Sequence, residues 1–318
     1  MNDPSSQTSR NGIVVGTDGG PDGDRATAYA VQDALRTERS IRVVHVIPEA
    51  VPMTPMLPLF SADSLRAVGT QILREAAERV RDLGKEEVAV ETVLAHGPRI
   101  PALLAHTYDA ALIVLGRRAS TLSRIRTGST TSAAAGRADC PVVAVPKEWS
   151  SAPVHGHVVA AVDGTPASAD VVHAALAAAH ERGGDLVDVH AWRPLAAYDR
   201  AFGGERAAEV WMRQTEPVVW SLVAGLRADQ PDVEVRVDLR YEHTADALVD
   251  AGRDADLLVM GRRGEGAMFG TALGSKARAL LRSGVCPVEI VPTRRPDPHD
   301  FPHQAESRDL PGRVDAPR

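Results

Sequence analysis

The sequence contains the same pattern twice, with a separation of 145 residues. Residues 13–21 read IVVGTDGGP, and residues 158–166 read VVAAVDGTP. His45 and His190 keep the same spacing, and so do the segments ALIVLGRR (111–118) and DLLVMGRR (256–263). A fourth match begins at Cys140 and at Cys286 and is offset by 146 residues. Ordered matches of this kind predict a duplicated domain. Each half of the chain must therefore form the same fold.

The composition excludes several classes of protein. The formal charge of −6 gives no general attraction to nucleic acid or to anionic lipid. Only 4% of residues are aromatic, which argues against stacking platforms for single-stranded nucleic acid. Two cysteines are too few for a disulfide scaffold or a cysteine-based zinc site. No apolar run could span a bilayer and the first residues lack a signal sequence, so a cytoplasmic protein is expected.

Each half alternates short apolar runs with amphipathic stretches of helical length. Apolar residues recur every three or four positions over 64–83, and 210–226 looks similar, so both predict helices. Apolar strands that alternate with helices favour an α/β fold, here two tandem doubly wound Rossmann-like domains, each a five-stranded parallel sheet flanked by helices. The predicted strands are 12–17, 41–47, 88–94, 111–115 and 142–145, then 157–162, 185–191, 233–239, 256–260 and 287–291.

The repeat also suggests domain boundaries. We expect a first domain over 11–147, a linker over 148–155 and a second domain over 156–293. The polar leader 1–10 and the proline-rich, charged tail 294–318 have too little apolar content to offset the entropy of ordering, so disorder is expected there.

The segment after the fourth strand of the second half has the features of a phosphate-binding loop. Gly261 and Gly264 allow a sharp turn and a close approach of the backbone to a ligand. Gly274 and Ser275 begin an expected helix, whose free N–H groups and positive dipole end favour an anion. Lys276 adds a positive charge one residue later.

Asp163 follows the first strand of the second half, where a doubly wound fold opens its cleft. Its carboxylate can bond a ribose hydroxyl or a phosphate-bound Mg²⁺, or it can cap the next helix through Thr165 and Ser168. Two better-known nucleotide motifs do not occur. Walker A places lysine before serine or threonine, whereas Ser275 precedes Lys276, and Gly-x-Gly-x-x-Gly does not follow the first strand.

The combined motifs resemble the universal stress protein family. They are Gly-x2-Gly-x9-Gly-Ser after the fourth strand, an early Val-Asp-Gly and a His-Ala-Trp after the second strand. The resemblance covers residues 11–147 and 155–293, as in the tandem members found in actinobacteria. It implies a five-stranded α/β fold related to adenine-nucleotide-binding folds. Many members bind ATP, and their role is usually regulatory under stress rather than metabolic.

Carried over by position, the resemblance implies a nucleotide site in the second half. ATP is the expected ligand, with Mg²⁺ on its phosphates, and no protein metal site or catalytic residue is implied. The residues assigned to the nucleotide, from base to phosphates, are Val162, Asp163, Gly164, His190, Ala191, Met260, Gly261, Arg263, Gly264, Gly274, Ser275 and Lys276.

The first half departs further from the family pattern. Ala119 stands where the second glycine belongs, and only eight residues separate it from Gly128. An alanine at a position that needs positive φ costs about 1 kcal/mol or more. We expect this site to be weak or empty, although Arg117 and neighbouring arginines could partly compensate. The residues of the weaker site are Asp18, Gly19, His45, Gly116, Arg118, Gly128, Ser129 and Thr130.

Simpler structural roles are also expected. His45 and His190 should pack or bond the backbone, and Cys140 and Cys286 should be buried thiols rather than a disulfide. In the resembling family the last strand lies at a sheet edge and pairs domains. The two halves should therefore form an internal pseudo-dimer, and a further homodimer stays open.

Three functions compete at this point. The first is an ATP-binding stress regulator with an unknown regulatory protein partner and at most weak ATP hydrolysis. The second is a slow ATPase or a nucleotidyl-transfer enzyme, for which no catalytic arrangement stands out. The third is a nucleotide-free interaction module. Neither nucleic acid nor membrane is expected as a partner.

Overall fold

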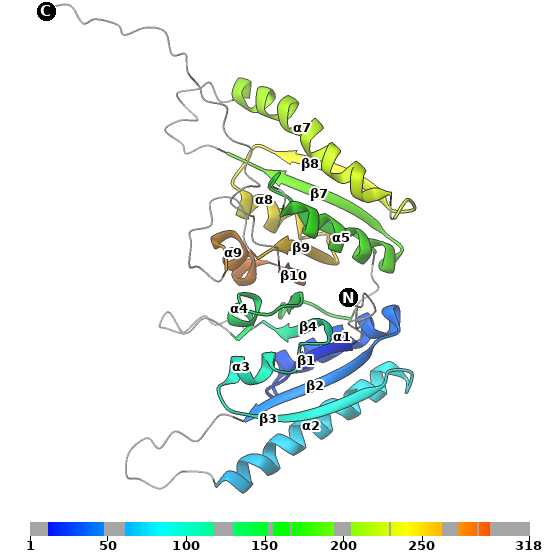
Figure 1. Ribbon diagram of the computed structural model, residues 1–318, viewed down its shortest axis with the longest axis vertical. Coiled ribbons are helices and arrows are strands. Elements are labelled where there is room, and N and C mark those ends of the chain that lie inside the picture. The colour runs from blue at the N-terminus through cyan, green and yellow to red at the C-terminus, as the bar shows by residue number, and fades with distance from the viewer. Residues whose placement is uncertain are drawn as a thin grey trace, which may run out of the picture.

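The computed structural model describes residues 12–47, 61–117, 130–151, 155–165, 167–193, 205–228, 230–262, 273–284 and 286–292 (Figure 1). The predicted leader and tail lie outside the described residues. Five residues of the candidate sites lie outside them as well: Arg118, Gly128, Ser129, Arg263 and Gly264.

Both halves alternate strands and helices in the same order. The first half contains β1 (Gly12–Gly16), α1 (Pro21–Thr37), β2 (Ser40–Ile47), α2 (Ala62–Gly84), β3 (Val90–His96), α3 (Arg99–Leu104), β4 (Ala110–Gly116), α4 (Thr130–Ala135) and β5 (Val142–Val145). The second half contains β6 (Val158–Ala161), α5 (Ser168–Arg182), β7 (Asp185–Ala191), α7 (Glu205–Arg227), β8 (Glu234–Arg240), α8 (Thr244–Ala251), β9 (Leu257–Gly261), α9 (Ser275–Ser283) and β10 (Val288–Val291). All ten predicted strands are present, with ends displaced by at most two residues.

All the strands belong to one ten-stranded sheet. Its order is β3-β2-β1-β4-β5-β10-β9-β6-β7-β8. Pairing is parallel within each half and antiparallel only between β5 and β10. Each half is doubly wound, and its strand order reverses between β1 and β4 or between β6 and β9. A ligand of such a sheet binds at this switch point, beyond the carboxyl ends of the strands.

Local sequence explains the elements well. The central strands are apolar on both faces because helices cover both sides of the sheet, and Ile13, Val14 and Val15 of β1 are all buried. Helix α1 begins at Pro21, whose missing N–H suits a first helical position. Helix α2 begins after Ser61, whose hydroxyl accepts a hydrogen bond from the backbone N–H of Ser64.

The two faces of the sheet join the halves differently. On one face, α3 and α4 share a continuous apolar core with α8 and α9. On the other face, α1 and α2 cover one core while α5 and α7 cover another. At the boundary between these two cores, Tyr29 of the first core lies near the buried or nearly buried side chains of Asp33, Arg182 and Glu289. The junction is therefore apolar on one side and polar on the other.

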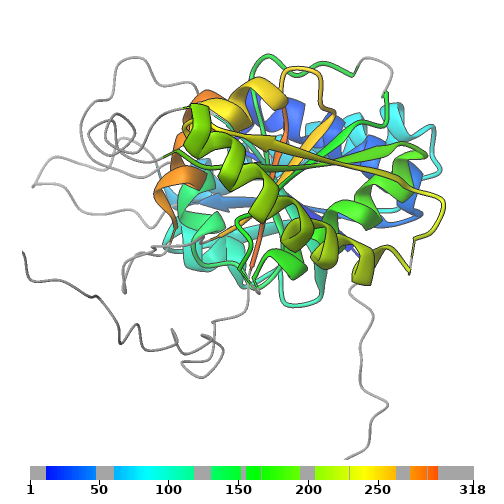
Figure 2. The same ribbon diagram turned by 90° about the horizontal axis from the view of Figure 1, so that it is seen from above.

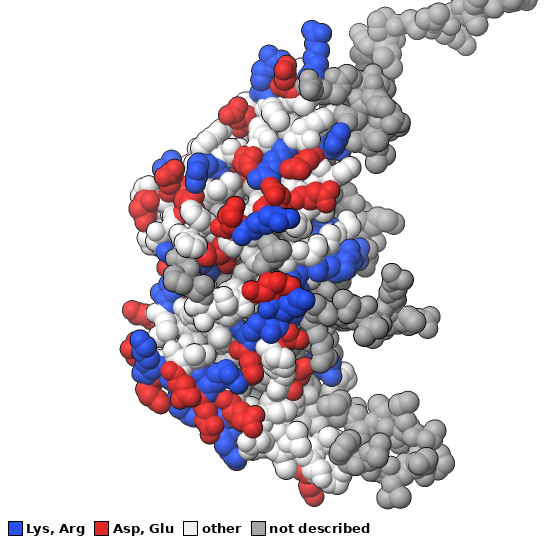
Figure 3. All heavy atoms as spheres, turned by 180° about the vertical axis from the view of Figure 1, so that it is seen from behind, with Lys and Arg blue, Asp and Glu red and all other residues white. Residues whose placement is uncertain are grey.

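The sheet twists strongly along its length. Viewed along the long axis, the strands of the two halves cross one another, as the accumulated right-handed twist of a sheet requires (Figure 2). The face seen in Figure 3 carries acidic and basic side chains interspersed, so no single sign of charge dominates it. Within the described residues, no helix has the length and apolar character needed to cross a bilayer.

Candidate functional site

The candidate site of the second half lies at the carboxyl ends of β6, β7 and β9. Val162, Asp163 and Gly164 directly follow β6, and Met260 and Gly261 end β9. The parallel pairing of β6 with both β7 and β9 brings these ends to one edge of the sheet. The predicted residues that are described therefore meet at the switch point.

Asp163 organises the turn that leads into α5. Its Oδ1 accepts hydrogen bonds from the Thr165 N–H (3.1 Å), the Thr165 hydroxyl (2.6 Å) and the Ser168 hydroxyl (2.8 Å). The Ser168 hydroxyl also accepts a bond from the Asp163 N–H (3.1 Å). Ala167 is the N-cap of α5, so Asp163 fixes the turn rather than capping the helix directly. The expected structural partners of Asp163 are confirmed, and a bound ligand would meet a pre-ordered carboxylate.

A histidine joins the first and second strands in the same way in each half. Nδ1 of His190 lies 3.0 Å from the carbonyl oxygen of Val162, and Nδ1 of His45 lies 2.9 Å from that of Thr17. Since a carbonyl only accepts, Nδ1 is the donor and carries the proton. The expectation of backbone hydrogen bonding is confirmed for both histidines.

Glycine is required after both aspartates. Gly164 has φ +74° and Gly19 has φ +77°, a region that side chains rarely adopt. A Cβ at Gly164 would lie 3.9 Å from Cε1 of His190, so this backbone passes close to the imidazole.

An aromatic ladder, made of His190, Trp211, Trp192 and Tyr241, borders this edge of the sheet. Trp211 of α7 stacks on His190 (5.5 Å between ring centroids) and on Trp192 (5.6 Å). Tyr241 meets Trp192 edge-on at 5.7 Å. Ile47 and His96 occupy the positions of Trp192 and Tyr241 in the first half. The ladder therefore distinguishes the second half, and the stacking of Trp211 on His190 was not predicted from the sequence.

The amino end of α9 lies at the same edge. Gly274 is its N-cap in an extended conformation, and among the described residues no side chain caps the helix there. The Gly274 N–H donates to the carbonyl of Arg262 (3.0 Å), which ties the start of α9 to the end of β9. Ser275 and Lys276 follow in the first turn, where helical N–H groups have no partner within the helix. This geometry suits an anion.

The first half differs at the corresponding positions. Asp18 is exposed, and its Oδ1 accepts a bond from the Gly20 N–H (3.0 Å). A Cβ at Gly116 would lie 2.1 Å from the carbonyl oxygen of Asp22, so this glycine admits the first turn of α1. Thr130 begins α4, a helix of only six residues. Gly116 is therefore explained by its packing against α1, without a ligand.

Arg117 corrects one expectation. The sequence suggested that it could strengthen a phosphate site in the first half. Its guanidinium instead donates to the carbonyls of Leu280 (3.3 Å), Leu281 (3.1 Å) and Gly284 at the end of α9. It is committed to the second half, because the β5–β10 pairing brings the carboxyl end of α9 within reach of the Arg117 side chain.

Asp188 is a second feature that sequence reasoning missed. It is wholly buried, and among the described residues neither of its carboxylate oxygens has a hydrogen-bond partner. It lies two residues before His190, hence on the same face of β7. Burial raises the pKa of Asp188 from 3.8 to about 7. Val43 holds the equivalent position in the first half. The presence of a charged residue at this position in only one half is the sequence signal that could have identified Asp188.

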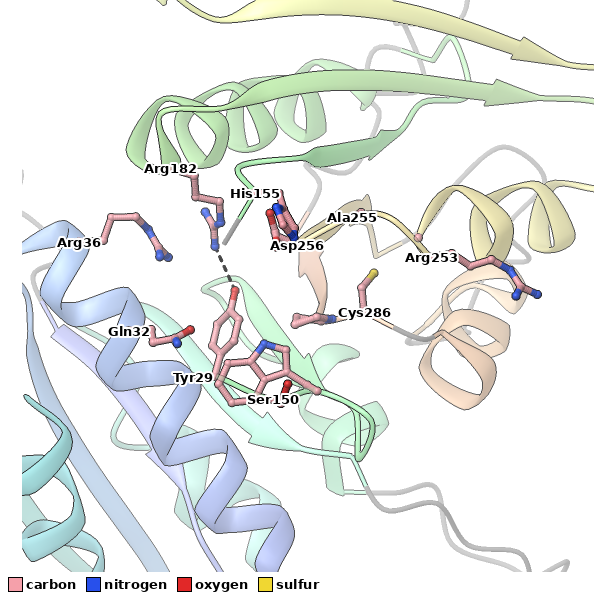
Figure 4. Close-up of a pocket in the computed structure, with 13 residues that line it drawn as sticks. Tyr29, Gln32, Arg36, Ser150, His155, Arg182, Arg253, Ala255, Asp256 and Cys286 are labelled. Atoms are coloured by element: carbon pink, nitrogen blue, oxygen red, sulfur yellow. Dashed lines mark hydrogen bonds between the residues drawn. The ribbon is translucent and has the colours of Figure 1, made fainter. Parts of the chain in front are cut away.

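A cavity of about 280 Å³ lies on the polar side of the junction (Figure 4). Tyr29 and Arg182 project into it from the two halves, and the Arg182 guanidinium donates to the Tyr29 hydroxyl (3.1 Å). Arg182 also lies 3.6 Å from Asp33, which pairs with Arg36. These groups link the two halves, so the cavity belongs to the contact between them, although Oδ2 of Asp33 and Nε of Arg36 have no hydrogen-bond partner among the described residues.

The two cysteines behave as expected. Cys140 and Cys286 are both free and buried. Burial raises the pKa of the Cys286 thiol to about 12, so this thiol stays protonated and unreactive in the folded state. Within the described residues, no group of three His, Cys, Asp or Glu is placed to hold a metal ion.

Comparison with known proteins agrees with the architecture. The Universal stress protein family matches residues 10–146 and again residues 155–292. The universal stress proteins Rv1996 and Rv2005c of Mycobacterium tuberculosis are 30% and 28% identical to the chain. Their alignments cover 90% and 88% of the chain and 96% and 97% of the relatives.

Solved structures share the fold. A universal stress protein from Archaeoglobus fulgidus superposes with a TM-score of 0.66 at 19% identity, over 89% of this chain and 98% of that one. A universal stress protein from Pseudomonas aeruginosa gives 0.57 at 16% identity, over 90% and 94%. With both halves matched, the chain belongs to the universal stress protein family as a tandem member.

Proposed function

We propose that the second half binds an adenine nucleotide, ATP with Mg²⁺, and that the protein acts as a cytoplasmic regulator in a stress response. The observation that supports this proposal is the position of the amino end of α9, which Gly274 ties to the end of β9 at the switch point. Phosphates would meet the first N–H groups of this helix and the side chains of Ser275 and Lys276.

The other parts of the site have complementary roles. Asp163 would bond the ribose or the Mg²⁺, since hard cations prefer carboxylate and phosphate oxygens. The backbone at His190 and Ala191 would face the base, with Val162, Gly164 and Met260 beside it. Arg263 and Gly264 would complete the phosphate loop together with Gly261. The first-half residues Asp18, Gly19, His45, Gly116, Arg118, Gly128, Ser129 and Thr130 would form a weaker site or none.

Calorimetric titration of the nucleotide-stripped full chain with Mg-ATP tests this proposal. We expect about one site per chain. Asp163→Asn should weaken binding at least tenfold, because it removes the charge while keeping the shape. Asp18→Asn is the matched control in the first half and should leave the affinity within twofold. Absence of binding up to millimolar ATP would contradict the proposal and favour a nucleotide-free interaction module.

A further inference from the structure

We infer that Arg117 of the first half is a positioning residue for helix α9 of the second half, so that the affinity for phosphates at one domain depends on a residue of the other. This inference rests on the proposed nucleotide site. It assigns the first half a role that does not require a ligand of its own.

Arg117 is anchored at both of its ends. Its backbone N–H donates to the carbonyl of Val145 (2.8 Å), at the end of β5. Its guanidinium crosses the junction to three carbonyls, those of Leu280 and Leu281 in α9 and that of the C-cap residue Gly284. The side chain is only 11% exposed, and Glu148 lies 3.7 Å from the guanidinium. A buried cation with this many partners is held in one position.

The contact between Arg117 and the carboxyl end of α9 is favourable because of the polarity of the helix. The last carbonyls of a helix lack partners within it, and they carry its negative dipole end. At α9 the Leu280 carbonyl also accepts the N–H of the C-cap residue Gly284 (2.7 Å). A guanidinium has several donors in a rigid fork, so it can satisfy these carbonyls together. Arg117 therefore fixes both the axial position and the tilt of α9 at its carboxyl end.

The opposite end of α9 is where phosphates would bind. The helix spans Ser275–Ser283, about 13 Å at 1.5 Å per residue, and so short a helix moves as a rigid unit. Its start is held by the Arg262 carbonyl, which accepts the Gly274 N–H (3.0 Å). Loss of the Arg117 contact would leave this hydrogen bond and the apolar packing of Ala277, Leu280 and Leu281. Apolar packing is not directional, so the N–H groups of Ser275 and Lys276 would be held less firmly in one direction.

The two halves exchange this contact. Arg262 is the repeat equivalent of Arg117, since each follows the glycine that ends a fourth strand. Its guanidinium donates to the carbonyl of Ala138, just beyond α4 of the first half. Figure 1 shows α4 and α9 facing each other across this junction. The exchange is unequal, because Arg117 holds a longer helix that begins at the candidate phosphate site.

The test compares ATP with adenosine on the full chain. Arg117→Met keeps the length and apolar packing but removes the donors. We expect it to weaken Mg-ATP binding at least fivefold, while adenosine, which has no phosphate to place on α9, binds within twofold of the unaltered chain. Arg117→Lys keeps a cation at the carbonyls and should recover part of the loss. It also serves if the methionine variant does not fold.

Arg42→Met is the matched control. Arg42 is a half-buried arginine of the first half that bonds Asp109 and Glu91, away from α9. Its replacement should leave ATP affinity within twofold. Hydrogen exchange of the α9 amides without nucleotide gives a second readout, and we expect at least fivefold faster exchange in Arg117→Met than in Arg42→Met.

The outcomes separate the two proposals. If the unaltered chain does not bind ATP, the proposed function is wrong, and unchanged exchange of α9 would then overturn the positioning role as well. If ATP binds the folded Arg117→Met variant with unchanged affinity, the inference is wrong and the proposed function stands. An equal loss of ATP and adenosine binding would also overturn the inference, because it would show damage to the whole site.

Discussion

Val143 and Glu289 pair directly with each other across the antiparallel junction, and they hold equivalent positions in the two halves. The flanking pairs, Val288 with Ala144 and Ile290 with Val142, are exchanged about this point. A local twofold axis therefore passes between Val143 and Glu289. At this position the second half has the carboxylate of Glu289 and the first half has the apolar side chain of Val143. The two halves therefore differ in sequence at the centre of their contact.

Glu289 should make stability depend on pH. Burial raises its pKa from 4.5 to about 7, although Arg182 favours the charged form and Asp33 and Glu181 oppose it. Because the folded state holds the proton more tightly, the contribution of Glu289 to stability falls as the pH rises from about 4.5 to about 7 and is constant above that. Glu289→Gln should gain about 2–3 kcal/mol of unfolding free energy relative to the unaltered chain between pH 5 and pH 8. Urea denaturation at both values measures it, and parallel pH profiles would contradict it.

Asp188→Val should stabilise the second half at pH 8. The substitution replaces a buried carboxylate, which has no hydrogen-bond partner among the described residues, by the residue that the first half has at this position, Val43. We expect a gain of about 2–4 kcal/mol, since removing an uncompensated buried charge recovers its desolvation free energy. Val43→Asp is the mirrored variant and should destabilise the first half. Thermal unfolding at pH 8 measures both, and a lower melting temperature for Asp188→Val would refute the prediction.

Gly116→Ala should be strongly destabilising. A Cβ there would lie 2.1 Å from the carbonyl oxygen of Asp22, so α1 would have to move away from β4. We expect a loss of about 2–3 kcal/mol, in the range of overpacked sites. Gly12→Ala is the matched control in the neighbouring strand, where the nearest atom to the new Cβ is the Ser40 hydroxyl at 3.6 Å. Chemical denaturation should show a loss at Gly116 at least twice that at Gly12.

The aromatic ladder should report on nucleotide binding. Trp211 stacks on His190, whose Nδ1 is bonded to Val162 at the candidate base site. A base placed there would change the surroundings of this ring pair, so Mg-ATP should alter the tryptophan emission by at least 10% in a saturable way. Trp211→Phe should remove most of that change. Trp220, exposed on α7, gives the control, because Trp220→Phe should preserve it. A signal that survives in Trp211→Phe would place the base elsewhere.

Much of the fold could be predicted because its signals are local. Val142–Val145 and Val288–Val291 are apolar runs that suit strands covered on both faces, and the repeat offset of the sequence aligns them with each other. The backbone contacts of His45 and His190 followed from their places at strand ends. Such features depend on neighbours along the chain or on an adjacent strand.

The contacts that were missed depend on distant elements. Arg117 reaches Leu280, which is 163 residues away, and only the antiparallel junction brings them together. The stacking of Trp211 on His190 depends on the position and orientation of α7 on the sheet. The apolar periodicity of the helix does not define either of them. The environment of Asp188 could not be predicted either. The sequence of an apolar strand does not show whether a polar residue within it has a hydrogen-bond partner.

Joining β5 to β10 has a consequence for aggregation. Within the described sheet only β3 and β8 remain as edges, and β8 carries Glu234, Arg236, Asp238 and Arg240 at alternate positions, which discourages pairing with other molecules. β5 has no charged residue and β10 has one, so either strand, if left open, would be a template for foreign strands. Because β5 and β10 belong to one chain, their effective concentration is high, and each pairs with the other before it pairs with a strand of another molecule.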